Sequence, residues 1–176
     1  MLQSDEILDR EATSERDFAA EAKRASAAMM VVEIFRKLSE FRQDYDKAPL
    51  DDILAMLRCS MSTANADTLM RDALLMDNEL RFRRPGGLDL HGTGHSSLSA
   101  DEGLLLALIQ VSDGPKSAPA MAVTKRLGVE NGRVLWQAAI AVARDLVRAG
   151  IDVKPPKAKW PVAKPIKWPS GSSTPP

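Results

Sequence analysis

A chain of 176 residues that is 44% hydrophobic and 27% charged can bury a core and stay soluble. Its length favours one domain or two very small ones. The single cysteine, Cys59, excludes an internal disulfide and a cysteine-based zinc site, and it favours a reducing cytoplasm. The acidic first residues do not form a secretory signal, and no apolar stretch approaches the roughly 18 residues of a membrane span.

The charges are spread unevenly along a chain whose formal net charge is zero. Residues 1–22 carry seven acidic and two basic side chains, whereas residues 153–176 carry five lysines and no acid. The residues between these ends therefore sum to zero. Because a duplex-DNA binder usually has a basic excess, the neutral centre argues against DNA binding, although it allows a local basic stripe.

The first half of the chain predicts three helices. Residues 17–45 contain no Gly or Pro and repeat apolar residues every three or four positions, which predicts a long amphipathic helix that ends near residues 44–47. Pro49 fits the first turn of a second helix that continues to Cys59. A short turn with an N-cap serine then leads into a third helix over residues 63–77.

A change of period marks the middle of the chain. Polar and apolar residues alternate around Pro85 over residues 79–92, which predicts a β-hairpin. The Gly/Ser-rich residues 92–97 predict a loop or hinge between the two halves.

The second half predicts three more helices. Ser99 and Glu102 form a capping box at the start of an apolar helix over residues 100–113. A short helix over residues 118–127 and a last helix that ends at Gly150 follow.

We therefore expect a mainly α protein with two small helix-turn-helix-like lobes, one short wing-like β-hairpin and disordered termini. The density of proline near the C-terminus prevents helices and sheet ladders there, so we expect an extended, disordered tail. The expected parts are an acidic disordered head (residues 1–16), a helical lobe with the hairpin (residues 17–92), a second helical lobe (residues 98–153) and a disordered tail (residues 154–176).

Each half has a long apolar helix, a short helix, a tight turn, another helix and a brief extended segment. This order resembles the winged helix-turn-helix of MarR-like bacterial regulators over roughly residues 28–92 and, more loosely, residues 104–153. The residues at the family's turn and locking positions in the second half are Val123, Leu127, Gly128, Val129 and Val134. Thr124 and Gly132 depart from the family pattern, and the first half has Cys59 or Ser60 at its turn, so a plain helical hairpin is the alternative.

The resemblance implies DNA binding by the third helix of a lobe in the major groove, with the hairpin arginines on phosphates or in the minor groove. Asp67 on that helix would repel phosphate, and the alternative is a solvated helix face beside a basic turn. The candidate DNA-contacting residues are Thr63, Asn65, Thr68, Arg71, Arg81, Arg83 and Arg84 in the first unit, and Asn131, Arg133 and Gln137 in the second.

Metal and catalytic motifs are weak. Asp89, His91 and His95 are residue types that bind zinc, but they stand in a glycine-rich loop without a fourth ligand. No Ser-His-Asp set, phosphate-binding loop or pair of carboxylates stands out. We therefore expect no metal, no cofactor and no enzymatic activity.

The tail combines lysine with tryptophan. Such a segment can grip single-stranded nucleic acid by charge and stacking, or dock into a partner's groove, or fold onto the acidic head. It can equally remain a solubilising tail. Its candidate contact residues are Lys157, Lys159, Trp160, Lys164, Lys167 and Trp168.

The leading hypothesis from the sequence is a cytoplasmic regulatory protein that acts on DNA or transcription, as a dimer through the long first helix. The alternative is a non-enzymatic helical adaptor that binds a protein partner through a Met-rich face or the tail. Acidic side chains interspersed among Arg71, Arg81, Arg83 and Arg84 would count against DNA binding.

Overall fold

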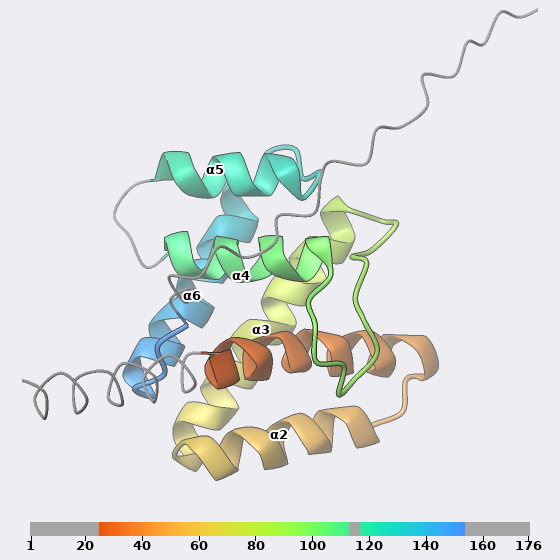
Figure 1. Cartoon of the computed structure of the whole chain (residues 1–176), viewed down its shortest axis with the longest axis vertical. Coiled ribbons are helices and arrows are strands. Elements are labelled where there is room, and N and C mark those ends of the chain that lie inside the picture. The colour runs from red at the N-terminus through yellow and green to blue at the C-terminus, as the bar shows by residue number, and fades with distance from the viewer. Residues whose placement is uncertain (1–24, 113–116, 154–176) are drawn as a thin grey trace, which may run out of the picture.

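The computed structural model describes residues 25–112 and 117–153, and its mainly helical architecture confirms the expected class (Figure 1). The first helix is described over residues 25–44. The further helices are α2 (Ala48–Ser60), α3 (Thr63–Arg83), α4 (Ala100–Ser112), α5 (Ser117–Arg126) and α6 (Arg133–Arg148). The predicted head, the start of the predicted first helix and the predicted tail lie outside the described residues.

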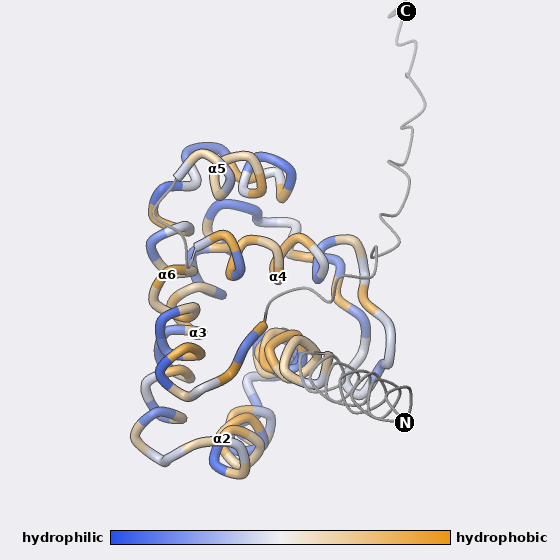
Figure 2. Tube along the Cα trace, turned by 60° about the vertical axis from the view of Figure 1, so that its left-hand side comes forward, coloured by the Kyte–Doolittle hydropathy of each residue, from blue (hydrophilic) through white to orange (hydrophobic). Residues whose placement is uncertain are grey.

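Four helices lie stacked one above another in the order α5, α4, first helix and α2 (Figures 1 and 2). α3 and α6 run across this stack and pack along each other. A loop of residues 84–99 leaves the end of α3, descends to the first helix and returns to the start of α4. The molecule therefore has a stack of four helices and a pair of helices, α3 and α6, across it.

The predicted β-hairpin over residues 79–92 is wrong. α3 continues to Arg83, and residues 25–112 and 117–153 contain no strand. Two ion pairs at i,i+4 spacing, Arg81 with Asp77 and Arg83 with Glu79, suit a helix in this segment. The wing that the resemblance to MarR-like regulators implied is therefore absent from the described chain.

The helix starts follow the predicted caps. Pro49 stands in the first turn of α2, and the Ser62 hydroxyl accepts a hydrogen bond of 3.4 Å from the N–H of Asn65 at the start of α3. At α4 the capping box is complete, because the Ser99 hydroxyl accepts from the N–H of Glu102 (3.1 Å) and the Glu102 carboxylate accepts from the N–H of Ser99 (2.7 Å).

Both predicted lobes contribute to one hydrophobic core. The hydropathy colouring of Figure 2 shows apolar stretches on every labelled helix. Fully buried side chains include Val31, Val32 and Leu38 of the first helix, Leu69 and Met76 of α3, Leu105 and Ile109 of α4, and Leu135 and Leu146 of α6. The two halves are thus joined by packing as well as by the loop.

The sequence suggested two surfaces for contacts with partners, the apolar face of the first helix and a Met-rich face. The apolar side chains of the first helix, such as Ile34 and Phe35, are buried within the chain, so a dimer through this helix gains no support. None of the seven methionines among the described residues is exposed. Met70 and Met76 are buried and the other five are half-buried, so the methionines form no fully exposed face in this part of the chain.

Candidate interaction surface

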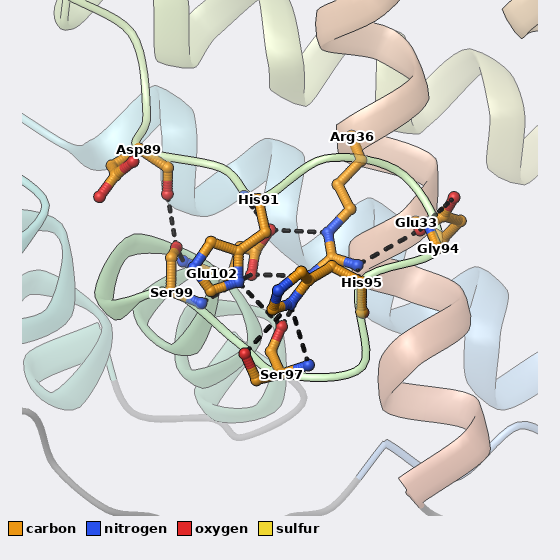
Figure 3. A network of polar contacts seen from close by, with 9 residues as sticks. All are labelled: Glu33, Arg36, Asp89, His91, Gly94, His95, Ser97, Ser99 and Glu102. Carbon is orange, nitrogen blue, oxygen red and sulfur yellow. Dashed lines mark hydrogen bonds and ion pairs between the residues drawn. The ribbon is translucent and has the colours of Figure 1, made fainter.

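A buried ion pair fastens the long loop between the helices. Arg36 is 1% exposed and Glu102 is 0% exposed, although both carry charge. Arg36 Nε donates to Glu102 Oε1 (2.8 Å) and Nη2 donates to Oε2 (3.0 Å), the paired geometry of guanidinium and carboxylate. The same guanidinium donates to the carbonyl oxygens of His95 (2.7 Å) and Ser97 (2.9 Å) (Figure 3). One side chain thus joins the first helix, the loop and α4.

The hydrogen bonds of this pair keep both partners charged. Burial by itself raises the pKa of Glu102, but hydrogen bonds from Arg36 and from the N–H groups of Ser99 and His91 outweigh it and hold the pKa below its usual value. The hydrogen bond to Glu102 outweighs the opposite effect of burial and raises the pKa of Arg36. The ion pair therefore holds the loop in place, and the charged groups of both partners have hydrogen-bond partners.

The two histidines of the loop, His91 and His95, make further contacts within the loop. Their ring centroids are 4.4 Å apart. His95 Nδ1 accepts from the N–H of Ser97 (3.3 Å), whereas His91 Nδ1 lies 3.1 Å from the carbonyl oxygen of Ser97 and must carry a proton there. No group of three or more His, Cys, Asp or Glu side chains that could hold a metal occurs within the described ranges.

The four arginines that we predicted to contact DNA in the first unit all pair with acids of the chain itself. The ion pairs are Arg71 with Asp72 (3.0 Å), Arg81 with Asp77 (3.5 Å), Arg83 with Glu79 (3.0 Å) and Arg84 with Asp101 (2.8 Å). Acids are thus interspersed among these arginines, which argues against phosphate binding by the first unit.

Two of these arginines also hold the second unit in place. Arg84 Nη1 donates to the carbonyl oxygen of Leu127 (3.2 Å), and Arg83 Nη1 donates to that of Asn131 (3.4 Å). Both carbonyls belong to the turn between α5 and α6. The residues that the sequence suggested as a wing therefore support a turn inside the same molecule.

The turn between α5 and α6 is tight. Gly128 has φ +74°, and Leu127 and Val129 are buried beside it, as the predicted spacing requires. Val134 was predicted to lock the two helices, but it is exposed, and Leu135 is buried instead.

Thr124 and Gly132, the two residues of the second half that depart from the MarR-like pattern, lie against each other. A Cβ atom on Gly132 would lie 2.5 Å from the Cβ of Thr124, which is itself buried. A glycine at the start of α6 is therefore what allows α5 to carry threonine at this point of close approach.

The remaining predicted DNA contacts differ in exposure. Thr63 is exposed, whereas Asn65 and Thr68 are half-buried and the Thr68 hydroxyl donates to the carbonyl oxygen of Ala64 (2.9 Å). Arg133 and Gln137 are exposed on α6. The six predicted tail contacts lie outside the described residues. The structure thus does not bring the predicted residues of the first unit together as one basic face, whereas Asn131 and Arg133 of the second unit line the same open groove.

Large apolar side chains gather where the sequence predicted no site. Leu75 is 57% exposed and Phe82 is 79% exposed, and their seven-residue spacing puts them on one face of α3. Val134, 42% exposed, stands in the first turn of α6. Exposure of this kind cannot be read from periodicity, because a sequence does not say which apolar residue lacks a neighbour.

The direction of α3 against α6 places Phe82 and Val134 at the same end of the pair of helices. Arg83 reaches Asn131 at one end of the pair of helices, and Asp72 lies beside Asp145 at the other end, so the two helices run antiparallel. Phe82 and Val134 therefore share one end. Exposed arginines mark the other end. We call the exposed residues Arg71, Leu75 and Phe82 of α3 and Val134, Arg144 and Arg148 of α6 the α3–α6 surface.

Two carboxyl groups are buried beneath the arginine end of this surface. Arg71 Nε contacts Asp72 (3.0 Å) and Arg148 Nη1 contacts Asp145 (3.4 Å) from the outside. Asp145 Oδ2 has no hydrogen-bond partner within the described residues. Burial, and then the neighbouring charge of Asp72, raise the pKa of Asp145. The charged form of Asp145 therefore opposes folding.

We expect Asp145→Asn to raise the free energy of unfolding at neutral pH by about 1 kcal/mol, since the amide can donate to Asp72. A carboxyl whose pKa is raised by folding destabilises the protein above that pKa and ceases to do so as the pH falls through it. The gain should therefore shrink on acidification in urea titrations. Asp52→Asn, at an exposed ion pair with Lys37, is the control and should change stability by less than about 0.5 kcal/mol. A loss of stability in Asp145→Asn at neutral pH would contradict this interpretation.

Neither a protein-family model nor a curated protein or solved structure matches this chain. No helix of the described ranges is long and apolar enough to cross a membrane. The function has therefore to be argued from the residues that the fold brings to the surface.

Proposed function

We propose that this chain is a non-enzymatic protein-interaction module that binds a partner protein through the α3–α6 surface. The observation that carries the proposal is the exposure of Leu75, Phe82 and Val134 on two adjacent helices. Large apolar side chains exposed on neighbouring helices are typical of contact surfaces, and burying one such side chain contributes about 1.5–3 kcal/mol.

The construction of the surface supports the proposal. The inner faces of α3 and α6 are fixed in the core by buried residues such as Leu69 and Leu146. Helices that are held in this way present their outer side chains at set positions, so little ordering entropy is lost on binding. Aromatic residues and arginines, which contribute most to binding at protein interfaces, are both present on this surface.

Site-specific photo-crosslinking tests this function. A benzophenone side chain in place of the exposed Phe82 should capture a protein in the cells from which the chain comes. Tyr45, equally exposed but located between the first helix and α2, is the matched control position. The adduct at position 82 should survive nuclease and disappear with protease. Adducts of equal yield at both positions, or an adduct lost with nuclease, would contradict the proposal.

A second candidate function is nucleic-acid binding by the unit of α5, its turn and α6. Lys125, Arg126 and Arg133 form no ion pair within the described residues. An open groove of about 910 Å³ lies over the turn between Lys125 and Arg133. Residues 117–148 contain five basic and two acidic side chains, so the local charge is positive.

If this second candidate is correct, the full chain should bind random-sequence duplex DNA with an affinity that falls steeply with salt concentration. Arg133→Glu should then weaken binding by about tenfold, whereas Arg58→Glu on α2 should not. Under the protein-interaction proposal we expect no measurable duplex binding at physiological salt. Fluorescence anisotropy with a labelled duplex gives both values.

A further inference from the structure

Building on the proposed function, we infer that the segment bound by the α3–α6 surface is an amphipathic helix with acidic residues beside its apolar face. Phe82 and Val134 lie at one end of the surface, with Leu75 nearer the middle, whereas Arg71 and Arg148 lie at the other end, where Val147 is also exposed. A ligand that satisfies both ends needs apolar and acidic side chains in one short segment.

The exposed charge of this surface is positive. Arg71 and Arg148 are both more than half exposed and contact the buried carboxylates with one nitrogen each. A guanidinium has five N–H donors, so each of these arginines retains donors for a ligand carboxylate. Arg144, also exposed, forms no ion pair within the described ranges. The nearby acid Glu79 is already paired with Arg83.

The spacing of the apolar residues favours a helix as the ligand. An amphipathic helix contacts a partner through apolar residues at i, i+3, i+4 and i+7. The seven-residue interval between Leu75 and Phe82 offers matching contacts over two turns.

The charge also distinguishes this ligand from a second copy of the chain. In a two-fold dimer residue i of the patch contacts residue j of the copy, so with Leu75 near the axis the arginine end of one copy would lie on the apolar end of the other. The arginines would then lose water without gaining a carboxylate, which opposes association. An acidic partner gains from the same arginines.

Two synthetic helical peptides test the inference with the full-length chain. They share leucines at i, i+3, i+4 and i+7, and they differ only in whether glutamates or lysines stand beside them. We expect the glutamate peptide to bind at least about tenfold more tightly in fluorescence anisotropy, with a preference that shrinks at high salt. Arg144→Glu should reduce that preference without loss of stability. Arg58→Glu, at an exposed pair on α2, should leave it unchanged.

The outcomes separate this inference from the function on which it rests. Equal binding of both peptides, or a preference for lysine, would overturn the acidic ligand. Failure of both peptides to bind would also overturn it, whereas protein capture at position 82 would still support the protein-interaction function. Arg71→Gln gives a second variant at the basic end, and its thermal unfolding shows whether the fold is retained.

Discussion

Replacing Arg36 with methionine is expected to lower the free energy of unfolding by about 3–5 kcal/mol, the usual cost of removing one partner from a buried ion pair. Glu102 would keep its charge without its main donor, and the carbonyl groups of His95 and Ser97 would each lose a hydrogen bond. Because small domains have a free energy of unfolding of only about 5–15 kcal/mol, this loss would remove a large part of the total stability. Urea unfolding followed by circular dichroism measures the loss.

Two further variants identify the cause of that loss. Adding Glu102→Gln to Arg36→Met should recover part of the stability, because the buried charge without a partner is then gone. Arg58→Met, at an exposed pair with Asp67, should cost less than about 1 kcal/mol. Equal losses in Arg36→Met and Arg58→Met would show that the buried pair has no special role.

The same pair sets an expected pH dependence. The pKa of Glu102 is lower in the folded protein than in the unfolded chain. Its contribution is therefore complete above the ordinary glutamate pKa of about 4.3 and is lost as the pH falls through the lower folded value. Stability of the wild type should accordingly fall more steeply below about pH 4 than that of Arg36→Met.

Gly132→Ala should destabilise the protein by about 1–3 kcal/mol, as overpacking of a close contact usually does. The new methyl group would meet the Cβ of Thr124 at 2.5 Å, and three atoms of that side chain lie within 2.8 Å. Both residues are held by helices that meet at a tight turn, so neither can move away alone. Thermal unfolding monitored by circular dichroism gives the shift.

Gly103→Ala in α4 is the matched control for this substitution. No atom lies within 4 Å of the position that its Cβ would take, so alanine should stabilise α4 by up to about 1 kcal/mol. In a Thr124→Gly background the added cost of Gly132→Ala should nearly vanish. If Gly132→Ala is as harmless as Gly103→Ala, α5 and α6 do not approach each other as described.

The sequence predicted helix starts well because capping is local chemistry. The capping box of Ser99 and Glu102 needs only four consecutive residues, and the structure contains it. The second role of Glu102, as partner of Arg36 from 66 residues earlier, follows from tertiary packing that periodicity does not report. A charged residue within an apolar stretch was the available signal, since Arg36 interrupts the buried face of the first helix.

The wrong hairpin has a comparable explanation. Residues 79–83 alternate in polarity, which suits a strand, but helical neighbours four residues apart also pair their charges. Burial of Leu80 against the core favours the helix. The sequence could not identify Leu75 and Phe82 as surface residues for a different reason. It shows that they are apolar, but their exposure depends on where α6 lies.

The most direct test of the interaction surface is the affinity of the full-length chain for the protein captured at position 82, measured by titration calorimetry. Leu75→Glu with Phe82→Glu should weaken binding by about 100-fold or more, which corresponds to about 2.7 kcal/mol. The fold should be kept because both side chains are exposed. Tyr45→Glu should bind as the wild type does. Binding of the double variant with wild-type affinity would show that the α3–α6 surface is not the site.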